Sequence, residues 1–352
     1  MFAFFLFFSI SQVCSNQVNL VFDPVYVTEN EQVSYFKSLQ MRNFLGSGYE
    51  FPVLNLLDSQ YVVTAHIGNP PQMFKLIPDI MTPITWVPSN KCWSLSCFLH
   101  SLYKSSDSLT HFPTTEKFSQ VYGSGKVTGV YSNDLLKVQN TELKIQFGEA
   151  NGFEGPSWLT ARFDGVLSLS SLLKHLREID SGSEYKIEVK KQNKENSVTS
   201  TIGGCEEGYQ YLSADVNKFF QVGGEKEKGK GGRLKVGQED RAEGVRVVVD
   251  LQTPLMMVDI KGTWDFEQDL RVESNCKGYN ELPEIEISFE SVKIRLKAED
   301  YVLRIADECL LGIIKTDFPE GWENTIVLGA MVLNKQQLCF DWESSELGFK
   351  PN

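Results

Sequence analysis

Two stretches of sequence decide how this chain is organised, because each runs from an apolar segment into an aspartate that is followed by threonine and proline. The first is Leu76-Ile77-Pro78-Asp79-Ile80-Met81-Thr82-Pro83, and the second is Val247-Val248-Val249-Asp250-Leu251-Gln252-Thr253-Pro254. A single copy is typical of a buried strand that ends in a turn, where the aspartate accepts backbone N–H bonds. Two copies, one in each half of the chain, indicate two lobes that each present one carboxylate.

The residues around both stretches form further recognisable segments. They are Tyr61-Val62-Val63-Thr64-Ala65-His66-Ile67-Gly68-Asn69-Pro70-Pro71-Gln72, Trp86-Val87-Pro88-Ser89, Tyr122-Gly123-Ser124-Gly125, Phe163-Asp164-Gly165-Val166-Leu167-Ser168-Leu169 and Ile326-Val327-Leu328-Gly329. Short alternating apolar segments separated by turn residues, as here, are typical of antiparallel strands.

Together these segments resemble the pepsin-like aspartic peptidases, in which each lobe carries Asp-Thr-Gly after an apolar strand. The resemblance covers residues 61–349 and implies an all-β, bilobal fold with few short helices. It implies that Asp79 and Asp250 are the catalytic pair, with Thr82 and Thr253 donating hydrogen bonds to them. It also implies a hairpin flap over the substrate.

The expected substrate-binding residues are Tyr122, Gly123 and Ser124 of the flap, together with Thr82, Thr253 and Trp86, and the resemblance implies that Trp86 hydrogen-bonds to Tyr122. The expected partner is therefore a peptide or protein substrate held between the lobes, with no cofactor and a monomeric chain.

Both motifs depart from the family at the two positions after the aspartate. Ile80 and Leu251 stand where the family has threonines that hydrogen-bond across the lobes, and Met81 and Gln252 stand where it has glycine. Loss of both hydrogen-bonding partners leaves no polar group stranded, so the fold should survive the change. Two hypotheses stay open: an endopeptidase of reduced or specialised activity, and a peptide-binding pseudoprotease of the same fold.

The chain divides into four expected parts. Residues 1–15 are apolar and end in small residues, which predicts a secretory signal, and residues 16–49 are a leader or reduced propeptide. For the leader we expect a simple edge strand or an ordered leader rather than a basic segment that masks the aspartates. Residues 50–215 and 216–352 are the N-terminal and C-terminal β lobes, with helices expected near 172–178 and 297–301.

Composition restricts the cellular setting. The net charge of -12 argues against nucleic acid as a partner. No apolar run after the signal approaches the roughly 20 residues of a membrane helix, so no membrane anchor is expected. The expected location is outside the cell or in an acidic vesicle such as a lysosome or vacuole. The mixed-charge, glycine-rich residues 223–235 predict a surface loop.

Seven cysteines are present, and Cys14 lies in the expected signal. The resemblance implies disulfides between Cys92 and Cys97 and between Cys276 and Cys309. For Cys205 and Cys339 two free buried thiols are the favoured expectation, and a bridge between the lobes is the alternative. The four histidines show no ligand spacing, so no metal site is expected.

Overall fold

The computed structural model describes residues 18–24 and 61–351, apart from residues 81, 123–124, 140, 155–157, 159–160, 180–183, 192–197, 217–219, 224–230, 251–252, 254, 261–263, 306, 317, 319–321 and 334–335. The expected signal therefore lies outside the described residues. So do most of the expected leader and the site residues Met81, Gly123, Ser124, Leu251 and Gln252.

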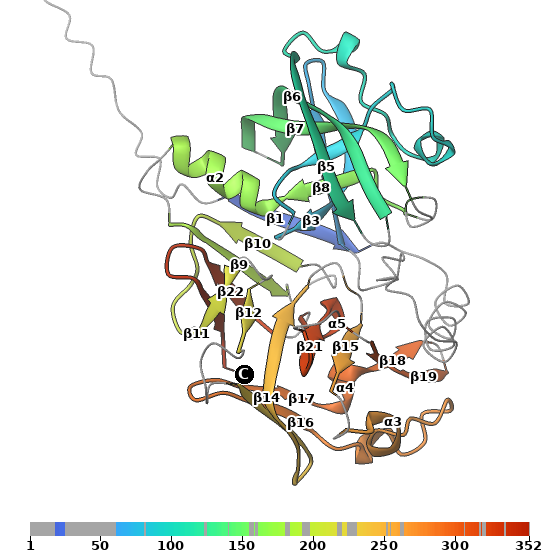
Figure 1. Ribbon diagram of the computed structural model, residues 1–352, viewed down its shortest axis with the longest axis vertical. Coiled ribbons are helices and arrows are strands. Elements are labelled where there is room, and N and C mark those ends of the chain that lie inside the picture. Colours follow the sequence, from blue (N-terminus) through green and yellow to red (C-terminus); the bar gives the residue numbers. More distant parts are fainter. Residues whose placement is uncertain are drawn as a thin grey trace, which may run out of the picture.

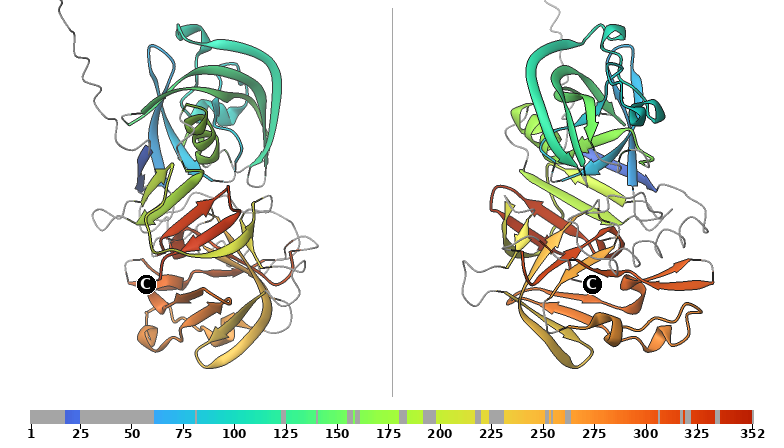
Figure 2. Two further views of the ribbon diagram at one scale, coloured as in Figure 1. Left: turned by 90° about the vertical axis from the view of Figure 1, so that its left-hand side faces the viewer. Right: turned by 45° about the vertical axis from the view of Figure 1, so that its right-hand side comes forward.

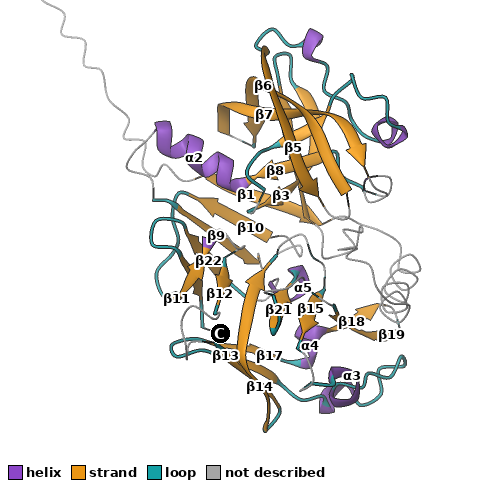
Figure 3. Cartoon of the chain, in the orientation of Figure 1, coloured by secondary structure: helices purple, strands orange, loops and turns teal. Residues whose placement is uncertain are grey.

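Strands make up most of the described chain, as predicted, and its α-helices are short (Figure 3). The strands of the first half are β1 Val18–Pro24, β2 Tyr61–Ile67, β3 Gln72–Asp79, β4 Trp86–Pro88, β5 Phe112–Tyr122, β6 Gly125–Val138, β7 Thr141–Glu154, β8 Gly165–Ser168, β9 Lys186–Lys191, β10 Val198–Ile202 and β11 Gln210–Asp215. Those of the second half are β12 Gln221–Val222, β13 Gly232–Val236, β14 Glu239–Val249, β15 Met256–Asp259, β16 Ile285–Ser288, β17 Lys293–Leu296, β18 Val302–Ile305, β19 Glu308–Leu311, β20 Ile313–Lys315, β21 Thr325–Leu328, β22 Leu338–Asp341 and β23 Glu346–Phe349. The helices are α2 Leu169–Ile179, α3 Phe266–Asp269, α4 Ala298–Tyr301 and α5 Ala330–Leu333, with short 3-10 helices η1 Leu95–Leu99, η2 Ser105–Asp107 and η5 Tyr279–Glu281. Helices α2 and α4 thus lie where the sequence predicted helices, near residues 172–178 and 297–301.

A six-stranded sheet joins the two lobes (Figures 1 and 2). Its strand order is β1-β10-β9-β22-β23-β11, so it takes strands from both halves of the chain. Ile187, Val189, Leu338 and Phe340 are buried on one face of β9 and β22, and Glu188, Cys339 and Asp341 are buried on the other, so both faces of these strands are covered. The expected edge strand in the leader is confirmed for β1, which forms one edge of this sheet and continues into a short pairing with β2.

Each lobe contains the same arrangement of strands after its aspartate-bearing segment. In the first lobe β3 lies parallel to β8, β4 pairs antiparallel with β8, and β4 lies parallel to β7. In the second lobe β14 lies parallel to β21, β15 pairs antiparallel with β21, and β15 lies parallel to β20. The repeated sequence stretches therefore occupy equivalent places in two repeated units.

Two expectations are wrong. Cys205 and Cys339 form a disulfide rather than two free thiols, because the pairing of β10 with β9 and of β9 with β22 brings their segments together although they are 134 positions apart. Residues 232–235 belong to strand β13 rather than to a surface loop, because Leu234 and Val236 alternate with charged residues and are buried. The implied disulfides Cys92–Cys97 and Cys276–Cys309 are present.

Candidate active site

Asp79 is the last residue of β3, and the local sequence explains why its carboxylate is buried. The apolar residues Leu76 and Ile77 place β3 inside the first lobe, beside the parallel strand β8. Asp79 is only 5% exposed. The hydroxyl of Thr82 donates to its Oδ2 atom, as the resemblance implies. A buried carboxylate needs such donors because an uncompensated charge is costly away from water.

Asp250 occupies the equivalent place in the second lobe. It directly follows β14, and its backbone N–H donates to the carbonyl of Leu328 on the neighbouring strand at 3.1 Å. The hydroxyl of Thr253 donates to Asp250 Oδ2 at 2.5 Å, so each aspartate is bound by the threonine three residues later. Unlike Asp79, Asp250 is partly exposed. The strands β3 and β14 both end in the region between the lobes (Figure 1).

The turn after Asp79 is fastened to the end of β8 by side chains. Ser168 lies opposite Asp79 in the register of the two strands, and it is fully buried. Its hydroxyl donates to the carbonyl of Thr82 at 2.6 Å, and the hydroxyl of Ser170 reaches the same carbonyl at 3.3 Å. The backbone N–H of Ser168 donates to Thr85 Oγ1 at 3.1 Å. Sequence reasoning did not identify this support, because it joins residues that are 83 to 88 positions apart.

The turn after Asp250 is fastened by the backbone instead. The carbonyl of Thr253 accepts a hydrogen bond of 2.7 Å from the N–H of Ala330. The residue equivalent to Ser168 is Gly329, and a Cβ atom there would collide with the carbonyl oxygens of Thr253 and Leu255. Glycine is therefore required in the second lobe, whereas the first lobe has room for a hydroxyl group.

Ile80 is buried in the main hydrophobic cluster at 4% exposure. An aliphatic side chain there offers no hydrogen bond to the other lobe, which agrees with the altered motif. Its counterpart Leu251 lies outside the described residues. Thr82 and Thr253, which donate to Asp79 and Asp250, each lie in the same lobe as the aspartate they bind.

The hairpin of β5 and β6 lies where the flap is expected. Tyr122 ends β5 and pairs with Gly125 at the start of β6. Trp86 is fully buried and packs against the rings of Phe153 and Trp158, with centroids 5.9 and 4.9 Å away. A hydrogen bond between Trp86 and Tyr122 stays a prediction, because the side chain of Tyr122 is outside the described part of the structure.

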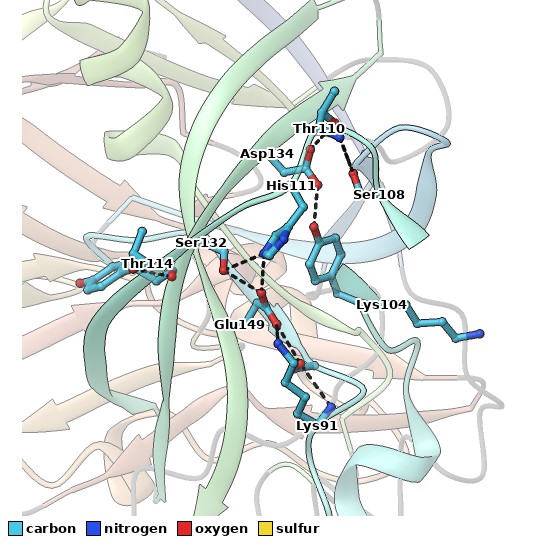
Figure 4. A network of polar contacts seen from close by, with 12 residues as sticks. Lys91, Lys104, Ser108, Thr110, His111, Thr114, Ser132, Asp134 and Glu149 are labelled. Carbon is cyan, nitrogen blue, oxygen red and sulfur yellow. Dashed lines mark hydrogen bonds and ion pairs between the residues drawn. The ribbon is translucent and has the colours of Figure 1, made fainter. Parts of the chain in front are cut away.

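A buried carboxylate that the sequence reasoning missed lies in the first lobe beside these elements (Figure 4). Glu149 is 1% exposed and accepts hydrogen bonds from Ser132 Oγ at 2.6 Å and Ser89 Oγ at 3.0 Å. His111 Nε2 lies 3.1 Å from Glu149 Oε1, and Lys91 Nζ lies 3.4 Å from Oε2. The available signal was its position on β7, where Leu143, Ile145 and Phe147 predict that residue 149 also points inward.

A second carboxylate of the same lobe is held by hydroxyl groups (Figure 4). Asp134 accepts hydrogen bonds of 2.5 Å from Tyr103 and from Thr110, and one of 2.8 Å from the N–H of Leu135. Burial raises the pKa of Asp134, but the hydrogen bonds from Thr110, Tyr103 and their neighbours outweigh it and hold the pKa below its ordinary value. Burial and the adjacent Asp134 carboxylate raise the pKa of Tyr103. Both groups therefore stabilise the lobe rather than titrate near neutrality.

Among the residues that the structure describes, no three His, Cys, Asp or Glu side chains come together as a metal ion would need. Within the same residues no helix is long and apolar enough to span a bilayer.

Comparison with known proteins connects both halves of the chain to aspartic peptidases and their relatives. Residues 60–194 match the family model described as eukaryotic aspartyl protease, and residues 271–351 match the model described as xylanase inhibitor C-terminal.

Individual relatives span most of the chain. Pepsin II-1 from Oryctolagus cuniculus is 28% identical over 323 residues, which are 84% of this chain and 81% of the relative. Renin from Ovis aries is 28% identical over 329 residues, with 84% and 81% covered. The vacuolar aspartic protease of Candida albicans is 26% identical over 338 residues, with 87% and 78% covered.

Proposed function

Because the chain belongs to the pepsin-like family of aspartic peptidases, we propose that it is an endopeptidase of reduced or specialised activity that uses Asp79 and Asp250 at acidic pH. One observation carries the proposal. Each aspartate ends the same strand unit in its own lobe, and each accepts a hydrogen bond from the threonine three residues later.

The chemistry follows from two carboxyl groups that share one proton. The proposal places the two groups about 3 Å apart, where like charges cannot both ionise, so one group would be a carboxylate and the other a carboxylic acid. The carboxylate acts as general base on a water molecule while the acid protonates the carbonyl oxygen of the peptide. Tyr122, Gly123 and Ser124 on the hairpin would cover the substrate.

The altered motifs account for the reduced rate in this proposal. A preorganised donor at a catalytic centre is typically worth about 2.7 to 4 kcal/mol, or roughly a factor of 100 to 1000 in rate. Ile80 has no hydrogen-bond donor in its side chain. Because the side chain is buried, a water molecule cannot supply the missing donor in its place. The threonines Thr82 and Thr253 retain part of the support.

The proposed substrate is an extended peptide held between the lobes, and the proposed location is outside the cell or in an acidic vesicle. The names of the relatives support this setting, because they include a pepsin and a vacuolar protease. The same proposal includes a secretory signal at residues 1–15 that directs the chain into the secretory pathway.

The test is cleavage of a denatured protein substrate by the purified chain over a series of acidic pH values. We expect slow, acid-dependent cleavage that Asp79→Asn and Asp250→Asn each abolish. Ser344→Ala, in the exposed turn between β22 and β23, is a matched control that should cleave at the rate of the unaltered chain. No product after long incubation at any pH would exclude the peptidase.

A peptide-binding pseudoprotease is the second candidate. It is supported by the aliphatic Ile80 and by the match of residues 271–351 to a model described as part of a xylanase inhibitor rather than of a protease. It predicts that a labelled peptide binds the chain and that binding persists when Asp79 and Asp250 are both replaced by asparagine. Loss of peptide binding in that variant, together with measurable turnover by the unaltered chain, would exclude it.

A further inference from the structure

Exposed apolar side chains are concentrated in one short segment of the first lobe. The described residues include eight large apolar side chains that are strongly exposed, and four of them fall within seven consecutive positions. Trp93 is 89% exposed, Leu95 73%, Phe98 65% and Leu99 64%. Isolated exposed apolar residues are ordinary on a protein surface, but such a cluster marks an interaction site. We call residues 92–99 the apolar loop.

The local structure turns these side chains outward. The disulfide Cys92–Cys97 closes the loop, and η1 covers Leu95–Leu99. In a 3-10 helix the residues i and i+3 lie above one another, so Leu95 and Phe98 share one face. Ser96 and Cys97 are buried on the opposite face. The exposed side chains therefore form one apolar surface that cannot turn inward without unwinding η1.

The base of the apolar loop is fixed to the lobe. Ser89 and Tyr103 form a β-bridge, and the N–H of Tyr103 donates to the carbonyl of Pro88 at 2.7 Å. The buried carboxylate of Glu149 binds Ser89 and Lys91 at one end of the loop (Figure 4). At the other end His100 lies within 3.1 Å of the carbonyl of Trp158. A preorganised loop loses little conformational entropy when it binds.

The size of the surface indicates what kind of partner it fits. A stable protein interface uses about 20 to 30 residues on each side, which is far more than this loop supplies. Binding to a bilayer requires fewer residues than a protein interface, because tryptophan, phenylalanine and leucine side chains partition individually into the boundary between headgroups and acyl chains. Between Cys92 and Leu99 the only polar side chains are serines.

Charge around the base is complementary to a phospholipid surface. Lys91 and Lys104 flank the β-bridge of Ser89 and Tyr103, and both are exposed (Figure 4). Lys91 has 58% of its side chain exposed but pairs with the buried Glu149, so the main attraction is assigned to Lys104. Cations beside an inserted apolar segment are attracted to anionic headgroups. The remainder of this acidic chain, with a net charge of -12, is repelled from such a surface, so contact is directed to this one loop.

We propose that the apolar loop inserts into the interface of a phospholipid bilayer that carries anionic headgroups and so holds the first lobe against it. The proposal is independent of peptide cleavage, since none of these residues belongs to the proposed catalytic site.

The experiment is co-sedimentation of the full chain with vesicles of phosphatidylcholine alone and of phosphatidylcholine mixed with phosphatidylserine. We expect binding to the mixed vesicles, and quenching of tryptophan fluorescence by brominated lipid. Most of the quenching should disappear in Trp93→Phe, because Trp86, Trp158 and Trp264 are buried and the partly exposed Trp322 and Trp342 lie in the second half of the chain, away from the apolar loop. The triple variant Trp93→Ser, Leu95→Ser and Phe98→Ser should lower binding at least tenfold. Lys104→Gln should lower binding to the mixed vesicles only.

The matched control is Leu109→Ser with Phe112→Ser, because these side chains are equally exposed, at 87% and 69%, but lie outside the apolar loop. This control should bind vesicles like the unaltered chain, and residues 1–15 are identical in all variants. Absence of vesicle binding by the unaltered chain would overturn the proposal, as would equal binding by the triple variant. Self-association that the triple variant abolishes, without vesicle binding, would assign the loop to protein contact and also overturn it.

Discussion

Asp79 and Ser168 lie opposite one another on the parallel strands β3 and β8, and both are bound to Thr82. The hydroxyl of Thr82 donates to the Asp79 carboxylate, while the carbonyl of Thr82 accepts from Ser168. The three residues thus form a chain of hydrogen bonds from the end of β8 to the proposed catalytic group. The second lobe has no equivalent side chain, because Gly329 stands at that place.

Replacement of Ser168 should therefore affect Asp79 through Thr82. We expect Ser168→Ala to lower kcat about tenfold with little change in KM, which is less than the roughly 100-fold effect of removing a direct donor. The free energy of unfolding should fall by about 1 to 3 kcal/mol, because the Ser168 hydroxyl both donates to the Thr82 carbonyl and accepts from the N–H of Ser171. Measurement of kcat and KM on a peptide substrate, with urea unfolding in parallel, checks both. The control is Ser170→Ala, whose bond to the same carbonyl is longer at 3.3 Å. A lower stability with unchanged kcat would assign Ser168 a structural role only.

Restoring threonine at both altered positions should raise activity. The double variant Ile80→Thr and Leu251→Thr would return one hydroxyl to each motif, and we expect kcat to rise roughly 10- to 100-fold. Ile80→Thr alone should destabilise the chain by about 1 to 3 kcal/mol, since a hydroxyl would then be buried in the cluster without its partner. Rates of peptide cleavage and urea unfolding of both single variants and the double variant test this. A double variant no faster than the unaltered chain would show that residue 80 does not limit the rate.

The sequence was sufficient to predict the repeated units, because their signals are local. An apolar run followed by aspartate and threonine fixes both a strand and its end, and the structure places Asp79 and Asp250 in equivalent positions. It was not sufficient for features that depend on distant segments. The bridge between Cys205 and Cys339 requires the strand order of the joint sheet, which no local pattern contains.

Two further errors have specific physical causes. In residues 223–235 the glycine and charge content concealed the alternation of Leu234 and Val236, which is typical of a strand with one buried face. Glu149 escaped notice because a buried carboxylate is uncommon, although its place on β7 predicted that it points inward. Its partners Ser89, His111 and Ser132 come from three other segments, so only the folded chain shows how its charge is compensated.

Removal of the bridge in the joint sheet should be more destabilising than removal of the bridge in the apolar loop. Cys205–Cys339 closes a segment of 134 residues and Cys92–Cys97 one of 5. Loop-closure entropy then predicts a loss of about 5 kcal/mol for the first pair and about 2 kcal/mol for the second when both cysteines are changed to alanine. Urea unfolding of the two double variants gives the comparison. Equal losses would contradict the entropic explanation.

Glu206 should contribute to stability only above strongly acidic pH. Hydrogen bonds from Lys190 at 2.5 Å and Lys350 at 2.9 Å lower the pKa of Glu206 to about 2. In the unfolded chain a glutamate has a pKa of about 4.3. Because the folded pKa is the lower one, the contribution is complete above about pH 4.3 and is lost as the pH falls towards 2. The ion pairs therefore persist at the mildly acidic pH of a vesicle.

The measurement is urea unfolding of the unaltered chain and of Glu206→Gln from neutral to strongly acidic pH. Since the Glu206 side chain is 53% exposed, solvent screens the pairs and the difference at neutral pH should be below about 1 kcal/mol. It should shrink towards zero as the pH approaches 2. Glu343→Gln, which removes the more exposed contact with Arg177, should change stability less at every pH. A difference between the chain and Glu206→Gln that grows on acidification would contradict the lowered pKa.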